Sequence, residues 1–176
     1  LILMKELISY LIEDMKQPIT YIPAGIVVGV LLAGMIWLIN KITGKKMEFR
    51  KLLGIWLLCI YSVVVIIQTF FSREPGSRSG IDLGLFSTWG VTWQAHAYVI
   101  ENVIMFLPLG ILLPMSGRRH VRFWEILFIS AALSILIEGV QLFTGRGFCQ
   151  LDDVVMNVLG GCLGYGIYQI IKFMKF

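Results

Sequence analysis

Apolar residues gather in five long runs that are separated by short polar links. A helix needs about 20 mostly apolar residues to cross the roughly 30 Å hydrocarbon core of a bilayer, and the runs approach or reach that length. The third run is the shortest, and it contains Pro108. We therefore predict an all-α, polytopic integral membrane helical bundle with about five transmembrane helices, at residues 19–39, 52–71, 99–115, 121–143 and 154–173.

The residues ahead of the first run follow a different pattern. Apolar residues recur at helical spacing, with charged residues between them. Such an amphipathic helix favours the membrane interface, where it lies flat. Pro18 and Pro23 indicate the turn into the membrane. We expect an amphipathic interfacial helix over 1–18 and a five-span transmembrane domain over 19–176.

One link is much longer than the others and covers residues 72–98. It begins with turn-forming residues and continues with the apolar segment 81–86, then Trp89 and Trp93. Tryptophan favours the headgroup level of a membrane. We predict an extracellular loop that is partly embedded in the membrane or lies against its surface.

Composition supports this class of protein. The chain is 57% apolar and 15% charged, whereas soluble domains are about 45–50% apolar and 25% charged. A soluble globular enzyme of this size would have too few polar residues to cover its surface. Disorder is excluded as well, because disordered chains have low hydrophobicity.

The net charge of +4 divides unevenly between the two sides of the predicted bundle. Ten Lys and Arg residues lie on the side of the C-terminus and five on the other, which holds nine of the eleven acids. Links rich in Lys and Arg stay in the cytoplasm. We predict a multi-pass protein of the plasma membrane, with the N-terminus outside and the C-terminus inside.

Polar side chains cluster at the outer ends of the last three spans. Glu138 is the most informative, because a carboxylate inside a transmembrane helix costs at least about 2.5 kcal/mol to insert. It therefore needs a partner, a proton or water. Gln141 shares its helix face. Short links bring the three spans together, so we predict a polar pocket formed by Asn102, Glu138, Gln141, Arg146, Asp152, Asp153 and Asn157.

Three roles are open for this cluster. It can be structural, with Arg146 paired to Glu138 and the amides completing the hydrogen bonds. It can bind a lipid headgroup or a sugar phosphate, which Arg146 would grip with two parallel hydrogen bonds. It can be catalytic, with Glu138 or Asp153 as general base. Either Asp152 or Asp153 can also cap the last helix.

Cofactor and metal chemistry have little support in the sequence. The cluster contains no histidine, and the chain has no phosphate-loop, zinc-protease or nucleophile-elbow pattern. We therefore predict no metal and no cofactor, and the balance is against an enzyme. The basic residues follow the topology rather than form a patch, so we expect no nucleic-acid partner.

Three blocks in order give the chain a resemblance to the VanZ-like family of bacterial membrane proteins. Residues 81–86 are similar to the family's outer-loop motif, and residues 101–110 to its Asn-hydrophobic-Phe-hydrophobic-Pro-hydrophobic-Gly stretch. The third block runs from Ser134 to Gly161 and resembles the family's Ser-Glu-Gln, Arg and Asp-Asn-Gly-Gly signature. The resemblance implies a role in the cell envelope and in resistance to the glycopeptide teicoplanin.

The leading hypothesis is a non-catalytic resistance protein that uses the polar pocket to bind a ligand of the outer leaflet. Membrane lipids are its expected partners, and a lipid-linked wall precursor or a lipoglycopeptide antibiotic is a further candidate. One alternative is a membrane enzyme that modifies a lipid-linked envelope substrate. Another is a structural membrane scaffold.

Overall fold

The structure is a computed structural model that describes residues 2–90, 92–117 and 121–174. It is helical almost throughout, and five of its helices are long and apolar enough to cross a membrane. This confirms the predicted all-α bundle. The helices are α1 (Ile2–Thr20), α2 (Ile22–Ile42), α3 (Phe49–Ile66) with a final π-helical turn η1 (Ile67–Phe71), α4 (Trp93–Met115), α5 (Phe123–Thr144) and α6 (Leu151–Met174).

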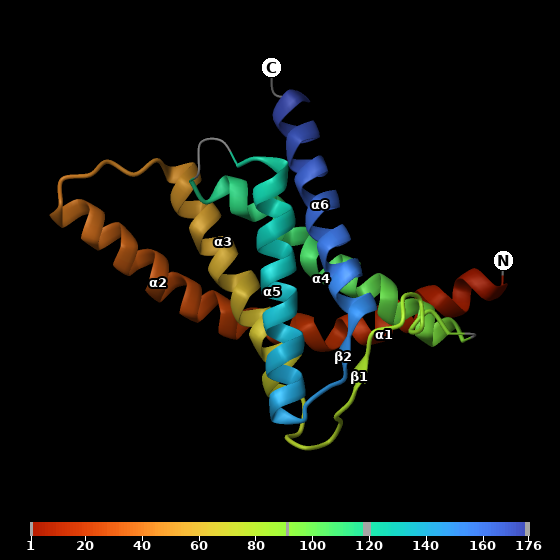
Figure 1. The fold of residues 1–176 in the computed structure, drawn as a ribbon. Coiled ribbons are helices and arrows are strands. Elements are labelled where there is room, and N and C mark those ends of the chain that lie inside the picture. The colour runs from red at the N-terminus through yellow and green to blue at the C-terminus, as the bar shows by residue number, and fades with distance from the viewer. Residues whose placement is uncertain (1, 91, 118–120, 175–176) are drawn as a thin grey trace.

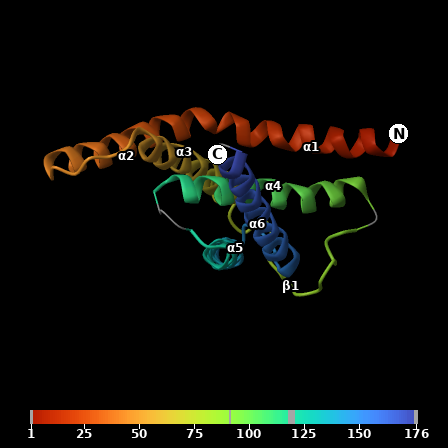
Figure 2. The same cartoon turned by 90° about the horizontal axis from the view of Figure 1, so that it is seen from above.

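Helix α4 packs against α6, α3 and α1, whereas α2 packs against α3 and α5 against α6. Figure 1 shows α5 and α6 running in opposite chain directions, with α1 lying crosswise near the end where β1 (Ile81–Asp82) and β2 (Cys149–Gln150) pair. Seen from above, α1 and α2 follow one another along one side, and α4 runs beside α1 (Figure 2). The most extensive helix contact is between α4 and α6.

Two helix boundaries differ from the prediction. Pro18 lies inside α1, and the break comes at Tyr21, just before Pro23 in the first turn of α2. Proline is tolerated there because the first amides of a helix have no intrahelical partner. The helix α4 begins at Trp93, six residues earlier than expected, because the Thr92 side chain accepts a hydrogen bond from the Ala95 amide and caps it.

Several features of the sequence analysis remain predictions. The structure confirms a helix over most of 1–18, but its place in the membrane interface is still a prediction, as is the membrane contact of the loop. Among the basic residues that set the predicted orientation, Arg118, Arg119 and Lys175 lie outside the described residues.

Glycines allow α4 and α6 to approach closely. A Cβ atom on Gly160 would overlap the Val103 carbonyl oxygen, and one on Gly164 would overlap that of Leu107. Across the contact, a Cβ atom on Gly110 would overlap the Gly161 carbonyl oxygen. In lipid, helices associate largely through such close packing. We call this contact the glycine seam.

The long loop is held against α6 at two places. The short strands β1 and β2 pair in parallel, with Ile81 opposite Cys149. Asp152, which is 2% exposed, accepts hydrogen bonds from the Phe86 amide at 2.6 Å, the Thr88 amide at 2.9 Å and the Thr88 hydroxyl at 2.7 Å. Asp152 therefore anchors the loop rather than capping α6.

Phe86 shows why the loop needs this anchor. Its φ angle is 61°, a left-handed conformation that bulky residues rarely adopt. Such a conformation costs on the order of 1–3 kcal/mol unless the surroundings hold it. The hydrogen bond from the Phe86 amide to Asp152 supplies that restraint.

Gly160→Ala is expected to destabilise the bundle, because the added methyl group meets the Val103 carbonyl across the glycine seam. Overpacking of this kind costs about 1–3 kcal/mol. Gly166→Ala is the matched control, since a Cβ there meets nothing within 4 Å, and it should be neutral or gain up to about 1 kcal/mol in helix propensity. Unfolding of both variants in mixed detergent micelles measures the difference. Equal stability of the two variants would contradict the seam.

Asp152→Ala is expected to release the loop, because two backbone amides and one hydroxyl lose their acceptor. Each unsatisfied buried donor costs about 1–3 kcal/mol. Chymotrypsin should then cut the loop near Leu85 and Phe86 much faster than in the wild type. Glu74→Ala, a change to an exposed carboxylate of the same loop, should leave the cleavage rate unchanged. An unchanged rate in Asp152→Ala would argue against the anchor.

Candidate functional site

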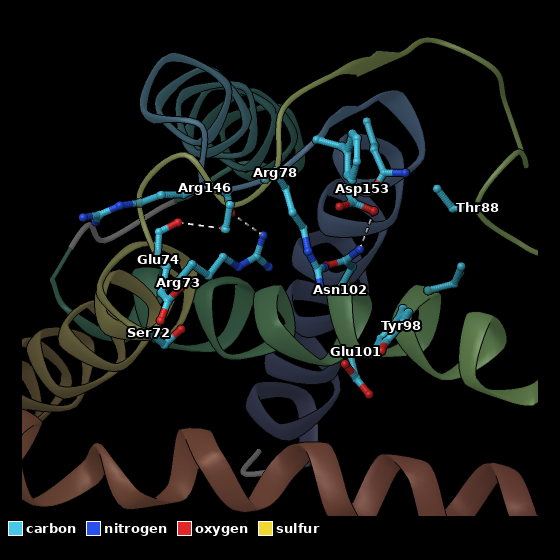
Figure 3. Close-up of a pocket in the computed structure, with 15 residues that line it drawn as sticks. Ser72, Arg73, Glu74, Arg78, Thr88, Tyr98, Glu101, Asn102, Arg146 and Asp153 are labelled. Atoms are coloured by element: carbon cyan, nitrogen blue, oxygen red, sulfur yellow. Dashed lines mark hydrogen bonds between the residues drawn. The ribbon is translucent and has the colours of Figure 1, made fainter.

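A polar cavity of about 580 Å³ opens at the end of the bundle where the long loop meets α4 and α6. Arginines and carboxylates line it in equal number: Arg73, Arg78, Arg146, Glu74, Glu101 and Asp153. Figure 3 shows Arg73 and Arg78 extending toward the side that holds Asn102 and Asp153. The loop thus supplies Arg73, Arg78 and Glu74, whereas the other two carboxylates, Glu101 and Asp153, come from α4 and α6.

An inner cavity of about 390 Å³ continues from the polar cavity into the bundle, between α1, α3, α4 and α5. Its apolar walls are formed mainly by Val64, Val65, Met105, Pro108 and Ile137. The two cavities share the residues at their junction, which are Arg73, Tyr98, Glu101, Asn102 and Asp153. The two cavities thus adjoin one another, and the inner one has both apolar and polar walls.

Glu138 lies in the inner cavity wall, and it is 3% exposed. Its Oε2 atom accepts a hydrogen bond from the Gln150 amide at 3.0 Å. Arg73 is the cation that interacts with it through charge. Burial lowers the pKa of the Arg73 guanidinium, and the charges of Glu138 and Asp153 oppose that shift.

The predicted pair between Glu138 and Arg146 is wrong. Arg146 instead donates from Nη1 to the Phe70 carbonyl at 2.9 Å, and its guanidinium lies 3.9 Å from the centre of the Phe70 ring. Phe70 lies in the last turn of η1, where carbonyl groups lack intrahelical donors and carry partial negative charge. The end of η1 therefore binds the guanidinium that one of the three alternatives paired with Glu138.

Gln141 and Asn157 join structural elements. The Gln141 side chain donates to the Thr69 carbonyl at 2.9 Å and ties α5 to η1. Asn157 is 1% exposed and donates to the Ser134 hydroxyl at 2.8 Å, between α6 and α5. Gln141 also lines the inner cavity, whereas the cavity linings include neither Asn157 nor the loop anchor Asp152.

Asn102 and Asp153 meet as predicted. The Asn102 side-chain amide donates to Asp153 Oδ1 at 2.7 Å, linking α4 to α6 where the two cavities join (Figure 3). Four of the seven predicted residues line the inner cavity, and two of these four also line the polar cavity. The four are Asn102, Glu138, Gln141 and Asp153, and Arg146 lines the polar cavity alone.

The predicted set omitted Arg73, Arg78, Asp14 and Glu101, which also line the cavities. Glu101 could have been found, because it lies two turns inside α4 and is subject to the same insertion cost as Glu138. The two arginines carry no such signal, since a loop arginine is ordinary and only the folded loop aims it at the cavity.

Known bacterial proteins share sequence with this chain. The model of the VanZ/LLP1 family matches residues 52–172, which include all three arginines of the polar cavity. Protein VanZ of Enterococcus faecium is 30% identical over 132 residues, which cover 68% of this chain and 76% of that protein. No solved structure matches the fold. On this evidence the chain belongs to the VanZ/LLP1 family.

Proposed function

We propose that this VanZ-like protein confers teicoplanin resistance on a bacterium by binding an amphiphile in the joined cavities. A membrane lipid, a lipid-linked cell-wall precursor or a lipoglycopeptide would each place a polar head in the polar cavity and a chain in the inner cavity. The observation that carries the proposal is that the two cavities adjoin and share five lining residues.

The size and lining of the two cavities support an amphiphilic ligand. Small-molecule sites occupy about 300–1,000 Å³ and combine apolar walls with a few convergent polar groups. Both cavities fall in that range, at about 580 and 390 Å³. An ordinary water-soluble ligand would use the polar cavity and leave the apolar walls of the inner cavity without a partner.

The guanidinium groups support an acidic head. An arginine can bind a phosphate or carboxylate with two parallel hydrogen bonds, and these bonds are stronger than neutral ones. Arg73 and Arg78 reach the cavity from the same loop (Figure 3). The anchor at Asp152 holds that loop in place and so presents both groups to the head.

The charge pattern supports a location of the site at the outer face of the membrane. Lys41, Lys45, Lys46, Arg50 and Lys51 lie in and beside the link between α2 and α3, at the opposite end of the bundle from the cavities. We propose that this end faces the cytoplasm, with the N-terminus outside and the C-terminus inside. The cavities then open at the outer leaflet of the plasma membrane.

Val65→Phe tests the proposal, because the larger side chain fills part of the inner cavity. We expect at least about a tenfold loss of lipid affinity, equal to about 1.4 kcal/mol, and a lower teicoplanin resistance in a susceptible host that expresses the variant. Native mass spectrometry measures bound lipid, and the minimal inhibitory concentration measures resistance.

Ile66→Phe is the matched control, because Ile66 is the next residue of α3 and is 52% exposed on the outside of the bundle. It should retain both lipid binding and resistance. If Val65→Phe folds, as judged by gel filtration and circular dichroism, and matches Ile66→Phe in both measurements, the inner cavity is not the binding site.

A further inference from the structure

We propose that the ligand is zwitterionic, with an anionic group bound by Arg73 and Arg78 and an amine bound by the carboxylates at the junction of the two cavities. This inference rests on the proposed function and deepens it, because it names the chemistry of the head.

The anionic half of the ligand is indicated by the arginines of the loop. Both Arg73 and Arg78 line the polar cavity, yet neither forms an ion pair within 4.0 Å with a carboxylate of the described residues. The Arg73 guanidinium donates a weak hydrogen bond to the Arg146 carbonyl at 3.5 Å. The two guanidinium groups therefore keep donors available for a phosphate or carboxylate.

The amine half is indicated by an excess of carboxylates in the inner cavity. Asp14, Glu101, Glu138 and Asp153 line it, and Arg73 is the single basic residue in that lining. A carboxylate inside a transmembrane helix costs free energy unless a positive charge or a proton neutralises it. A positively charged group on the ligand would supply that charge.

Asp14 and Glu101 locate the amine more closely. Their carboxyl groups are within hydrogen-bond reach of one another across α1 and α4, and Figure 3 shows Glu101 pointing toward α1. Asp14 Oδ2 and Glu101 Oε1 are buried without a hydrogen-bond donor. Two facing carboxylates repel unless a proton or a cation lies between them. An ammonium group has three donors and can serve both.

The geometry favours an organic amine over a metal ion. Within the described residues, no three Asp, Glu, His or Cys side chains come close enough together to hold a metal. An ammonium group carried on a ligand needs fewer converging acceptors, because the arginines and the apolar walls hold the remainder of the molecule. The same head chemistry occurs in phospholipids with an ethanolamine head and in amine-bearing lipoglycopeptides.

Binding of matched lipids to the detergent-purified full chain tests the inference. The probes are phosphatidylethanolamine, N-acetyl-phosphatidylethanolamine and phosphatidylglycerol, all with the same acyl chains. We expect phosphatidylethanolamine to bind at least about tenfold more tightly than the other two, because only it carries a charged amine that can form charge-assisted hydrogen bonds. Titration monitored by native mass spectrometry gives the three affinities.

Two variants separate the halves of the site. Glu101→Gln should remove the preference for the free amine while leaving phosphatidylglycerol affinity unchanged. Arg78→Gln should weaken all three lipids by about tenfold, since each has a phosphate. Glu6→Gln, a change to an exposed carboxylate on α1, is the control and should bind like the wild type. If Glu101→Gln does not fold, the wild-type affinities for phosphatidylethanolamine and N-acetyl-phosphatidylethanolamine still test whether the site binds a charged amine.

The outcomes distinguish this inference from the proposed function. Equal binding of the three lipids by the wild type overturns the zwitterionic ligand but keeps the amphiphile site. If the wild type binds none of the three lipids and Val65→Phe has the same teicoplanin resistance as the wild type, both the zwitterionic ligand and the proposed function are overturned. Once the amine preference is established, displacement of phosphatidylethanolamine by teicoplanin identifies the antibiotic as a ligand of this site. Failure to displace it supports a membrane lipid.

Discussion

The close contact between α4 and α6 is the constraint on which the rest of the structure depends. Gly110 on one side and Gly160 and Gly164 on the other bring the two backbones together. Helices in lipid gain little from the hydrophobic effect when they associate, so contact at this distance supplies much of the stability. The seam also sets the site, because Asn102 and Asp153 extend it at the loop end and meet at the junction of the cavities.

Polar residues near the seam divide into two groups with different tasks. One group is committed to internal hydrogen bonds, as Asp152 is to the loop and Asn157 is to Ser134. The other group faces the cavities with donors or acceptors left over, as Arg78 and Glu101 do. The residues with internal hydrogen bonds hold the cavity-facing residues in position. Buried polar groups are almost always hydrogen-bonded, and these bonds fix the loop and the helices that carry the cavity-facing side chains.

The helix α1 completes the site although it precedes the part of the chain that matches the family. The match begins at residue 52, whereas Asp14, Met15 and Pro18 line the inner cavity. The contact of α1 with α4 closes that cavity on one side and brings Asp14 opposite Glu101. The accessory helix thus contributes both a wall and a charge to a site whose remaining residues belong to the VanZ-like domain.

The sequence by itself determined the five spans, the family and the gathering of Asn102, Glu138 and Asp153, because hydrophobic length and the cost of a charge in lipid are properties of single segments. Only the tertiary structure decided the partners. Glu138 bonds to the Gln150 amide and Arg146 to the Phe70 carbonyl, while the loop brings Arg73 and Arg78 to the cavity. These partners depend on the path of the loop and on contacts between residues up to 76 positions apart in the sequence. No local sequence pattern encodes such contacts.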